Sequence, residues 1–247
     1  MSINEKTLKI VIPKGRLYKN VVTLLNDMGL GIETDERQYI PRVEAPCVEA
    51  KIMKPQNIPQ LVEVGSHDLG FTGLDWLEET GGNVEVLTDL GFNPVKIISA
   101  VPDSFNEQDL RDRKIVVASE YERIARRYLD SKGFDYFFIR TFGATEVFPP
   151  DDADMIIDNM SSGRTLVEHK LNVIDRLMDS STRVIANRDS MKDPQKRKKI
   201  DELLTLMQAV LDARSRVMLE MNVPEGKLDA IVRDLPCMRA PTVAALY

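Results

Sequence analysis

The chain has few of the residues that build disulfide frameworks, metal sites and membrane spans. Its 247 residues include two cysteines, Cys47 and Cys237, and two histidines, His67 and His169. Two cysteines cannot form a disulfide framework and favour a reducing compartment, and the histidines lack the spacing and partners of a metal site. No apolar run approaches the ~18 residues of a membrane helix, and the N-terminal segment has no signal-peptide core. We therefore expect a cytoplasmic protein with no membrane partner.

Positive charge is not in excess either. Lysine and arginine together number 33 against 39 aspartates and glutamates, which gives a net charge of −6. Nucleic-acid binding relies on basic side chains that displace condensed counterions, so nucleic acid is not the expected partner. Small anions are not excluded, because a few cations and helix N-termini can dominate one pocket.

Short apolar runs alternate with amphipathic segments along most of the chain. Strands are predicted at Leu8–Pro13, 47–53, Leu69–Gly73, 84–90, 95–101, 114–118, 136–142 and 155–157, with helical spacing of apolar residues after several of them. This alternation is typical of an α/β protein with mainly parallel sheets covered on both faces. After a basic stretch at 193–199, we expect a long helix, a strand at 217–223, a helix at 225–235 and a last strand at 242–246.

Residues 153–166 (ADMIIDNMSSGRTL) are the most informative stretch. An apolar strand ends in Asp158, and a loop of small hydroxyl residues and one glycine leads to a helix start. A carboxylate can hold ribose hydroxyls, while amides at a helix N-terminus bind phosphate. The stretch therefore favours a sugar-phosphate site, with a turn capped by Ser162 as the structural alternative.

Three other strand ends carry charged residues or glycine. Lys14 and Arg16 flank a glycine after the first strand, where the ligand crevice of an open α/β sheet lies. Asp75 follows Gly73, and Glu146 follows a strand exit at 143. Either acid could instead complement a helix N-terminus, and the two cations could be a solvated helix start.

Taken in order, these segments resemble the ATP phosphoribosyltransferase family. The matching stretches are IPKGRL, KPQNIPQLVEVGSHDLGFTGLDWL, TDLGF, VVASEY and FGATEVFPPDDADMIIDNMSSGRTL. The resemblance implies a two-lobed α/β core like that of type II periplasmic binding proteins, with the active site between the lobes. It also implies transfer of phosphoribose from phosphoribosyl pyrophosphate (PRPP) to N1 of ATP, with Mg²⁺ as cofactor and release of pyrophosphate, the first step of histidine biosynthesis.

The resemblance assigns roles to particular residues. Asp158 would hold the ribose hydroxyls of PRPP, and the 5′-phosphate would lie in the loop formed by Ser161, Ser162, Gly163, Arg164 and Thr165. On the ATP and pyrophosphate side, the resemblance points to Lys14, Gly73, Leu74, Asp75 and Glu146. The catalytic cations would be Arg16, Arg37 and Lys54, and Asp154 would be linked to magnesium.

The chain departs from the family pattern at two positions in the stretch that begins at Lys54. Lys54 stands where the family has arginine, which loses a bidentate fork but keeps the charge. Asn57 replaces the family's usual aspartate. Either change could alter affinity or rate without removing the chemistry.

The expected domains are a first lobe (1–94 with 184–200, ATP and pyrophosphate side) and a second lobe (95–183, with the phosphate loop). Residues 201–247 resemble part of the ferredoxin-like regulatory domain of the long form of the family. We expect a homo-oligomer, either a dimer or a hexamer. A PRPP-dependent transferase with another acceptor, and a non-catalytic nucleotide-binding paralogue, are the alternatives.

Overall fold

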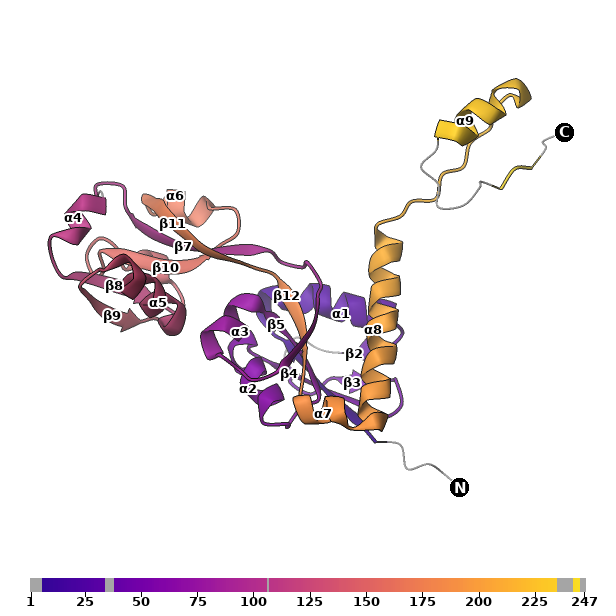
Figure 1. Cartoon of the computed structure of the whole chain (residues 1–247), viewed down its shortest axis with the longest axis horizontal. Helices are drawn as coiled ribbons and strands as arrows, with labels where there is room; N and C mark the ends of the chain where they lie inside the picture. The colour runs from indigo at the N-terminus through magenta and orange to yellow at the C-terminus, as the bar shows by residue number, and fades with distance from the viewer. Residues whose placement is uncertain (1–5, 34–37, 106, 235–241, 245–247) are drawn as a thin grey trace. The chain divides into compact units, whose positions relative to one another are not determined.

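The computed structural model describes residues 6–33, 38–105, 107–234 and 242–244. It divides into two compact units, Met1–Val210 and Leu211–Tyr247. The first unit contains two five-stranded sheets (Figure 1). Among the described residues, no helix combines the length and the apolar character needed to cross a membrane.

The first sheet has the strand order β4-β1-β5-β12-β6. Its strands are β1 (Leu8–Pro13), β4 (Val48–Met53), β5 (Leu69–Gly73), β6 (Glu85–Asp89) and β12 (Thr182–Ala186). β1 pairs in parallel with β4 and β5, and only β12 runs against its neighbours. The helices α2 (Ile58–Glu63) and α3 (Leu74–Thr80) contribute Ile58, Val62 and Leu77 to a core against Val11 and Ile185 of this sheet.

The second sheet has the order β11-β7-β10-β8-β9. Its strands are β7 (Val95–Pro102), β8 (Ile115–Ser119), β9 (Tyr136–Arg140), β10 (Met155–Met160) and β11 (Leu171–Ser180). β8, β9 and β10 are parallel, and only β7 is reversed. The predicted α/β architecture with mainly parallel sheets is therefore confirmed.

Both faces of the second sheet are covered. Ile97 and Val101 of β7 pack with α4 (Glu107–Arg111) and α5 (Glu122–Lys132), whereas Ile98 and Ala100 pack on the side of Leu166 in α6 (Arg164–Glu168). Successive strand residues point to opposite faces, so a strand covered on both sides reads as one apolar run. This explains why the apolar runs predicted the strands.

The remaining elements of the first unit lie around these sheets. They include α1 (Tyr18–Asp27), the short hairpin β2 (Ile32–Glu33) and β3 (Arg42–Val43), α7 (Arg188–Lys192) and three single 3₁₀ turns at Gly15–Leu17, Pro55–Asn57 and Thr145–Val147. Helix α8 (Pro194–Arg214) belongs to this unit up to Val210, and its last turn belongs to the second unit.

The chain passes from the first sheet to the second between β6 and β7 and returns at Ser181, between β11 and β12. The boundary expected at 183/184 therefore falls inside β12. The sequence gives no sign of this return, because β11 continues into β12 with one intervening residue and without a glycine or proline turn. The boundary expected at 200/201 falls inside α8, and the compact unit extends to Val210.

The second unit contains a short 3₁₀ turn, Glu225–Lys227, and α9 (Leu228–Asp234), where the sequence predicted a helix. The strand expected at 217–223 is not formed, and residues 242–244 of the last expected strand are not in a strand; residues 245–246 lie outside the described residues. A strand needs a partner for its backbone N–H and C=O groups, and no described residue of this unit supplies one.

Candidate functional site

Two carboxylates meet at one edge of the second sheet. Asp158 lies near the carboxyl end of β10, and Glu120 directly follows the neighbouring parallel strand β8. The backbone N–H of Asn159 donates a hydrogen bond of 2.6 Å to Asp158 Oδ1, and the Asn159 side-chain amide donates to the same oxygen at 3.1 Å. This edge is where ligands bind in open α/β sheets.

The environment of Asp158 shifts its ionisation. Burial raises the pKa of the Asp158 carboxyl to about 7, and the carboxylates of Glu120 and Glu146 act in the same direction. The hydrogen bonds from Asn159 oppose the rise. Burial also raises the pKa of Glu120, while the charges of Lys54 and Arg140 counteract it. The edge thus concentrates carboxyl groups that favour a ligand rich in hydroxyls or carrying a cation.

The predicted phosphate loop follows β10 directly. Gly163 has a left-handed φ of +78° and is the residue that precedes α6, so it, and not Ser162, occupies the N-cap position. Ser161, Ser162 and Thr165 are exposed. The Arg164 guanidinium forms an ion pair with Glu168 at 2.8 Å along the helix. The loop therefore presents hydroxyls and helix-start amides beside Asp158.

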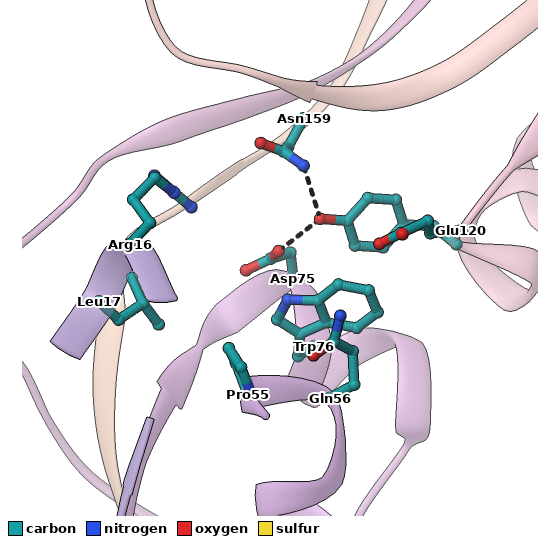
Figure 2. A pocket seen from close by; sticks show the side chains of 9 residues that line it. Arg16, Leu17, Pro55, Gln56, Asp75, Trp76, Glu120 and Asn159 are labelled. Atoms are coloured by element: carbon teal, nitrogen blue, oxygen red, sulfur yellow. Dashed lines mark hydrogen bonds between the residues drawn. The ribbon is translucent and has the colours of Figure 1, made fainter. Parts of the chain in front are cut away.

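A cavity of about 170 Å³ lies between the two sheets. It is lined from the first-sheet side by Arg16, Leu17, Pro55, Gln56, Asp75 and Trp76, and from the second-sheet side by Glu120, Tyr121 and Asn159 (Figure 2). Of the residues predicted from the sequence, Arg16 and Asp75 of the first lobe line this cavity, whereas Asp158 and the loop 161–165 of the second lobe do not.

Asp75 is a buried and firmly held side chain of this cavity. It is 2% exposed and accepts hydrogen bonds from the hydroxyls of Ser180, at 2.5 Å, and Tyr121, at 2.8 Å. The backbone N–H of Asp75 donates to Ser180 Oγ at 3.0 Å. A Cβ at Gly73 would lie 2.0 Å from Asp75 Oδ1, so the glycine is required for this arrangement. Asp75 is thus a positioned acceptor as well as a first-turn acid.

Trp76 and Tyr121 form an aromatic pair across the lobes. Their rings stack with centroids 4.6 Å apart and an interplanar angle of 27°. Burial raises the pKa of the Tyr121 hydroxyl well above its usual value, and the neighbouring Asp75 adds to this. The hydroxyl therefore stays protonated and donates to Asp75.

The predicted cations lie at the ends of the first-lobe strands. Arg16 donates to the backbone carbonyl of Asn93 at 3.0 Å, and the Asn93 side chain donates back to the Arg16 carbonyl at 3.1 Å. Lys14 Nζ donates to Tyr39 Oη at 3.0 Å. Lys54 is exposed and close enough to Glu120 to lower its pKa. Arg37 lies outside the described residues.

The Asp154 carboxylate is bound by other groups of the protein. It forms a two-bond ion pair with Arg113, at 3.1 and 2.5 Å, and accepts the backbone N–H of Val116 at 2.8 Å. Burial alone would raise its pKa, but these partners hold it below the usual value. It precedes β10, whereas Asp158 lies near the other end of that strand. The structure therefore argues against Asp154 as a magnesium ligand.

Several residues that line the cavity were not predicted from the sequence: Gln56, Trp76, Glu120, Tyr121 and Asn159. Ser180, which donates to Asp75, was not predicted either. The position of Glu120 could have been found from the sequence, because it directly follows an apolar strand. Asp158 lies similarly near the end of one. Tyr121 has the helical spacing of the apolar residues Ile124 and Leu129, and this spacing does not reveal the position of its hydroxyl. Ser180 approaches Asp75 only through the return of β11 to the first sheet.

Comparison with known proteins gives matches over most of the chain. Residues 54–209 match the family model described as ATP phosphoribosyltransferase, and residues 213–247 match the one described as HisG, C-terminal domain. An ATP phosphoribosyltransferase of Chlorobium phaeovibrioides is 35% identical over 100% of this chain and 86% of its own length. One of Sulfolobus acidocaldarius is 38% identical over 97% and 85%.

The fold has a solved counterpart. The structure titled ATP phosphoribosyl transferase (HisG:HisZ) complex from Thermotoga maritima has a TM-score of 0.76 and 27% identity, covering 84% of this chain and 100% of that chain. The family model alone spans more than half of the residues. The chain belongs to the ATP phosphoribosyltransferase family.

Proposed function

We propose that the protein transfers 5-phosphoribose from PRPP to N1 of ATP, the first step of histidine biosynthesis. The observation that carries this proposal is the position of Asp158 beside the loop 161–165, at an edge of the sheet that opens on the cavity shared by both lobes. The family description names ATP and the phosphoribosyl group that is transferred, which supports PRPP as the donor. The geometry offers a place where a sugar phosphate and a second ligand could meet.

On the PRPP side, Asp158 accepts hydrogen bonds from the ribose hydroxyls. The 5′-phosphate lies against the start of α6, where backbone amides and the hydroxyls of Ser161, Ser162 and Thr165 converge. Gly163 supplies the left-handed turn that leads into the helix. Arg164 serves as a nearby positive charge that can leave Glu168 for the phosphate, because both side chains are exposed.

On the ATP side, Gly73, Leu74 and Asp75 form the wall at the start of α3, with Trp76 and Tyr121 as aromatic surface. Lys14, Arg16, Arg37 and Lys54 attract the phosphates of ATP and the departing pyrophosphate. Glu146 acts on this site through its charge, which favours the protonated form of Asp158.

The reaction forms a bond from adenine N1 to the anomeric carbon and breaks the bond from that carbon to the pyrophosphate oxygen, which leaves with the electron pair. Adenine N1 is a neutral nucleophile, so no strong general base is needed. The ribose gains oxocarbenium character and pyrophosphate gains negative charge. Catalysis therefore depends on positioning and on stabilising the leaving group, where one preorganised donor contributes roughly 3 kcal/mol.

Magnesium fits this site as a substrate-bound ion. No group of three histidine, cysteine, aspartate or glutamate side chains in the described part of the chain could hold a metal by itself. Mg²⁺ is commonly bound by phosphates with one or two carboxylates, and the carboxyls of Asp158 and Glu120 meet that need. Bound in this way, the ion would neutralise pyrophosphate charge. A homo-oligomer and a cytoplasmic location stay predictions.

The direct test is to incubate the protein with ATP, PRPP and Mg²⁺ and to measure the phosphoribosyl-ATP adduct by mass spectrometry together with released pyrophosphate. A protein that binds PRPP but forms adduct only with another base would contradict the acceptor. A folded protein that binds both substrates without any turnover would contradict the transferase assignment.

The site assignment predicts selective losses. Asp158→Ala and Thr165→Ala should each weaken PRPP binding by about 10- to 100-fold, because hydrogen bonds involving charged groups contribute about 1.5–3 kcal/mol. ATP binding, measured on the same samples by calorimetry, should change less than about threefold and serves as the control. Equal losses for both ligands would show that these residues do not belong to a PRPP subsite.

A further inference from the structure

An unbroken set of hydrogen bonds joins the two acids of the proposed substrate subsites. The Tyr121 hydroxyl donates to Asp75 Oδ2 at 2.8 Å and accepts from the Asn159 side-chain amide at 3.3 Å, as the dashed lines of Figure 2 show. The same amide donates to Asp158 Oδ1 at 3.1 Å. We call Asp75, Tyr121, Asn159 and Asp158 the relay.

The relay crosses from one lobe to the other. Asp75 belongs to the start of α3, which packs on the first sheet, and Tyr121 directly precedes α5, which packs on the second sheet. The end at Asp75 is also anchored to Ser180, the last residue of β11 before the chain returns to the first sheet. The contact between Tyr121 and Asp75 therefore depends on the placement of one lobe against the other, whereas the two contacts of Asn159 lie within the second lobe.

The two central groups of the relay, the Tyr121 hydroxyl and the Asn159 side-chain amide, do not take part in a bond-forming or proton-transfer step of the proposed reaction. The Tyr121 hydroxyl is buried and held protonated, so it takes no part in proton transfer near neutral pH. The Asn159 amide is neutral and donates to both Tyr121 and Asp158. Their contacts connect the groups that would touch substrate.

We propose that the Asn159 side chain and the Tyr121 hydroxyl are positioning groups that make the binding of ATP and of PRPP mutually favourable. The inference rests on the proposed function and deepens it. A ligand that contacts Asp75 stabilises the hydrogen bond between Asp75 and Tyr121 that joins the lobes, and through Tyr121 the Asn159 amide that donates to Asp158, so Asp158 is already held when the second ligand arrives. The first ligand to bind bears the entropic cost of fixing the relay side chains, and the second ligand does not bear it again. Such coupling is reciprocal between the two ligands.

The test measures this coupling without turnover. The probe for the nucleotide is 1-deaza-ATP, in which carbon replaces the N1 nucleophile, so that PRPP and the probe can occupy the protein together without reacting. The Kd of PRPP is measured by calorimetry with Mg²⁺ in the absence and presence of saturating 1-deaza-ATP. For the unaltered protein we expect PRPP to bind about fivefold more tightly when the probe is present.

Asn159→Ala removes both side-chain links and leaves Asp75, Tyr121 and the backbone N–H at 159 in place. We expect the coupling to fall below about twofold, with the Kd of each ligand alone changed much less than in Asp158→Ala. Asn172→Ala, an exposed asparagine on β11 of the same sheet, is the matched control and should keep the full coupling.

Tyr121→Phe interrupts the relay from its other side and keeps the ring that stacks on Trp76. It should also abolish the coupling, and the double variant Tyr121→Phe/Asn159→Ala should lose no more than either single variant. This second variant decides the matter if Asn159→Ala fails to bind PRPP.

The outcomes separate the two proposals. If the unaltered protein binds neither PRPP nor 1-deaza-ATP, the proposed function fails. If it binds both but shows no coupling, or if both variants keep the coupling of the unaltered protein, the role of the relay is overturned.

Discussion

The ionisation of Asp158 is the main electrostatic feature of the proposed PRPP subsite, because burial and two neighbouring carboxylates act on it together. With a folded pKa near 7 it binds a proton over a pH range in which an ordinary aspartate, with a pKa of about 3.9, is ionised. The raised pKa of Asp158 therefore stabilises the folded protein most below about pH 4, and this stabilisation is lost as the pH rises through about 7. A carboxyl that is costly to ionise when alone becomes useful once ribose hydroxyls or a cation compensate its charge.

This environment predicts a pH dependence that one neighbour controls. Removing the Glu120 charge with Glu120→Gln should lower the pKa of Asp158, because Glu120 raises it in the folded protein. A ¹³C NMR titration of the Asp158 carboxyl, assigned with Asp158→Asn, would give the midpoint in each protein. PRPP affinity of the unaltered protein should rise between about pH 6 and 8, and in Glu120→Gln the rise should begin at lower pH.

Two results would contradict this account of Asp158. The first is a midpoint near 4 in the unaltered protein, which would mean that burial does not disfavour the charged form. The second is an unchanged midpoint in Glu120→Gln, which would mean that the two carboxyls do not interact.

At the scale of elements, helices α3 and α5 form a contact between the lobes. The Glu79 carboxylate of α3 accepts the backbone N–H groups of Arg123 and Ile124, at 3.0 and 3.1 Å, in the first turn of α5. Tyr121, at the N-cap of α5, supplies no side-chain cap. Glu79 thus satisfies donors that a helix otherwise leaves unpaired, and it does so from another lobe.

Glu79→Ala should lower the free energy of unfolding by about 1 kcal/mol, the usual cost of a lost cap. Urea denaturation measures this cost, and amide hydrogen exchange should become faster at residues 123 and 124. Glu78→Ala is the matched control: its carboxylate pairs with Arg127 at 3.5 Å on the surface, and such pairs contribute little. Equal effects of the two variants would mean that the cap does not matter.

The elements also show what sequence reasoning reaches and what it misses. Apolar runs covered on both faces, such as 155–157, predict strands directly. The position of Asp158 near the carboxyl end of β10 follows from local order in the chain, so the apolar run before it is enough to predict that position. The return at Ser181 has no local mark, and the hydroxyl contacts of Tyr121 and Ser180 arise between segments far apart in sequence, which periodicity cannot reveal.

The strand expected at 217–223 failed for a related reason. Most of its residues are apolar, but Val217 is 92% exposed, and the described residues of the second unit provide no strand to pair with it. Local propensity for a strand depends on burial and on cross-strand neighbours. A prediction from pattern alone is therefore least secure where the partner strand is missing.

At the scale of the whole molecule, the proposed chemistry belongs entirely to the first unit. All described residues assigned to ATP, PRPP or pyrophosphate lie between Lys14 and Thr165, within Met1–Val210. In the second unit, no residue that the structure describes is buried. Since burial of apolar surface supplies most folding free energy, we expect the described part of the second unit to have little stability of its own.

A chain that ends at Arg214, the last residue of α8, should therefore keep its fold and its substrates. We expect the Kd values of ATP and PRPP to stay within about twofold of the full chain, and the midpoint of thermal unfolding to move by no more than a few degrees. Exposed Val217, Met218 and Leu219 would be removed, so a homo-oligomer that depends on this apolar stretch should become smaller by light scattering. Loss of both substrates in a folded, truncated protein would instead show that residues 215–247 are needed to complete the site, because the first unit would then hold the named residues without binding their ligands.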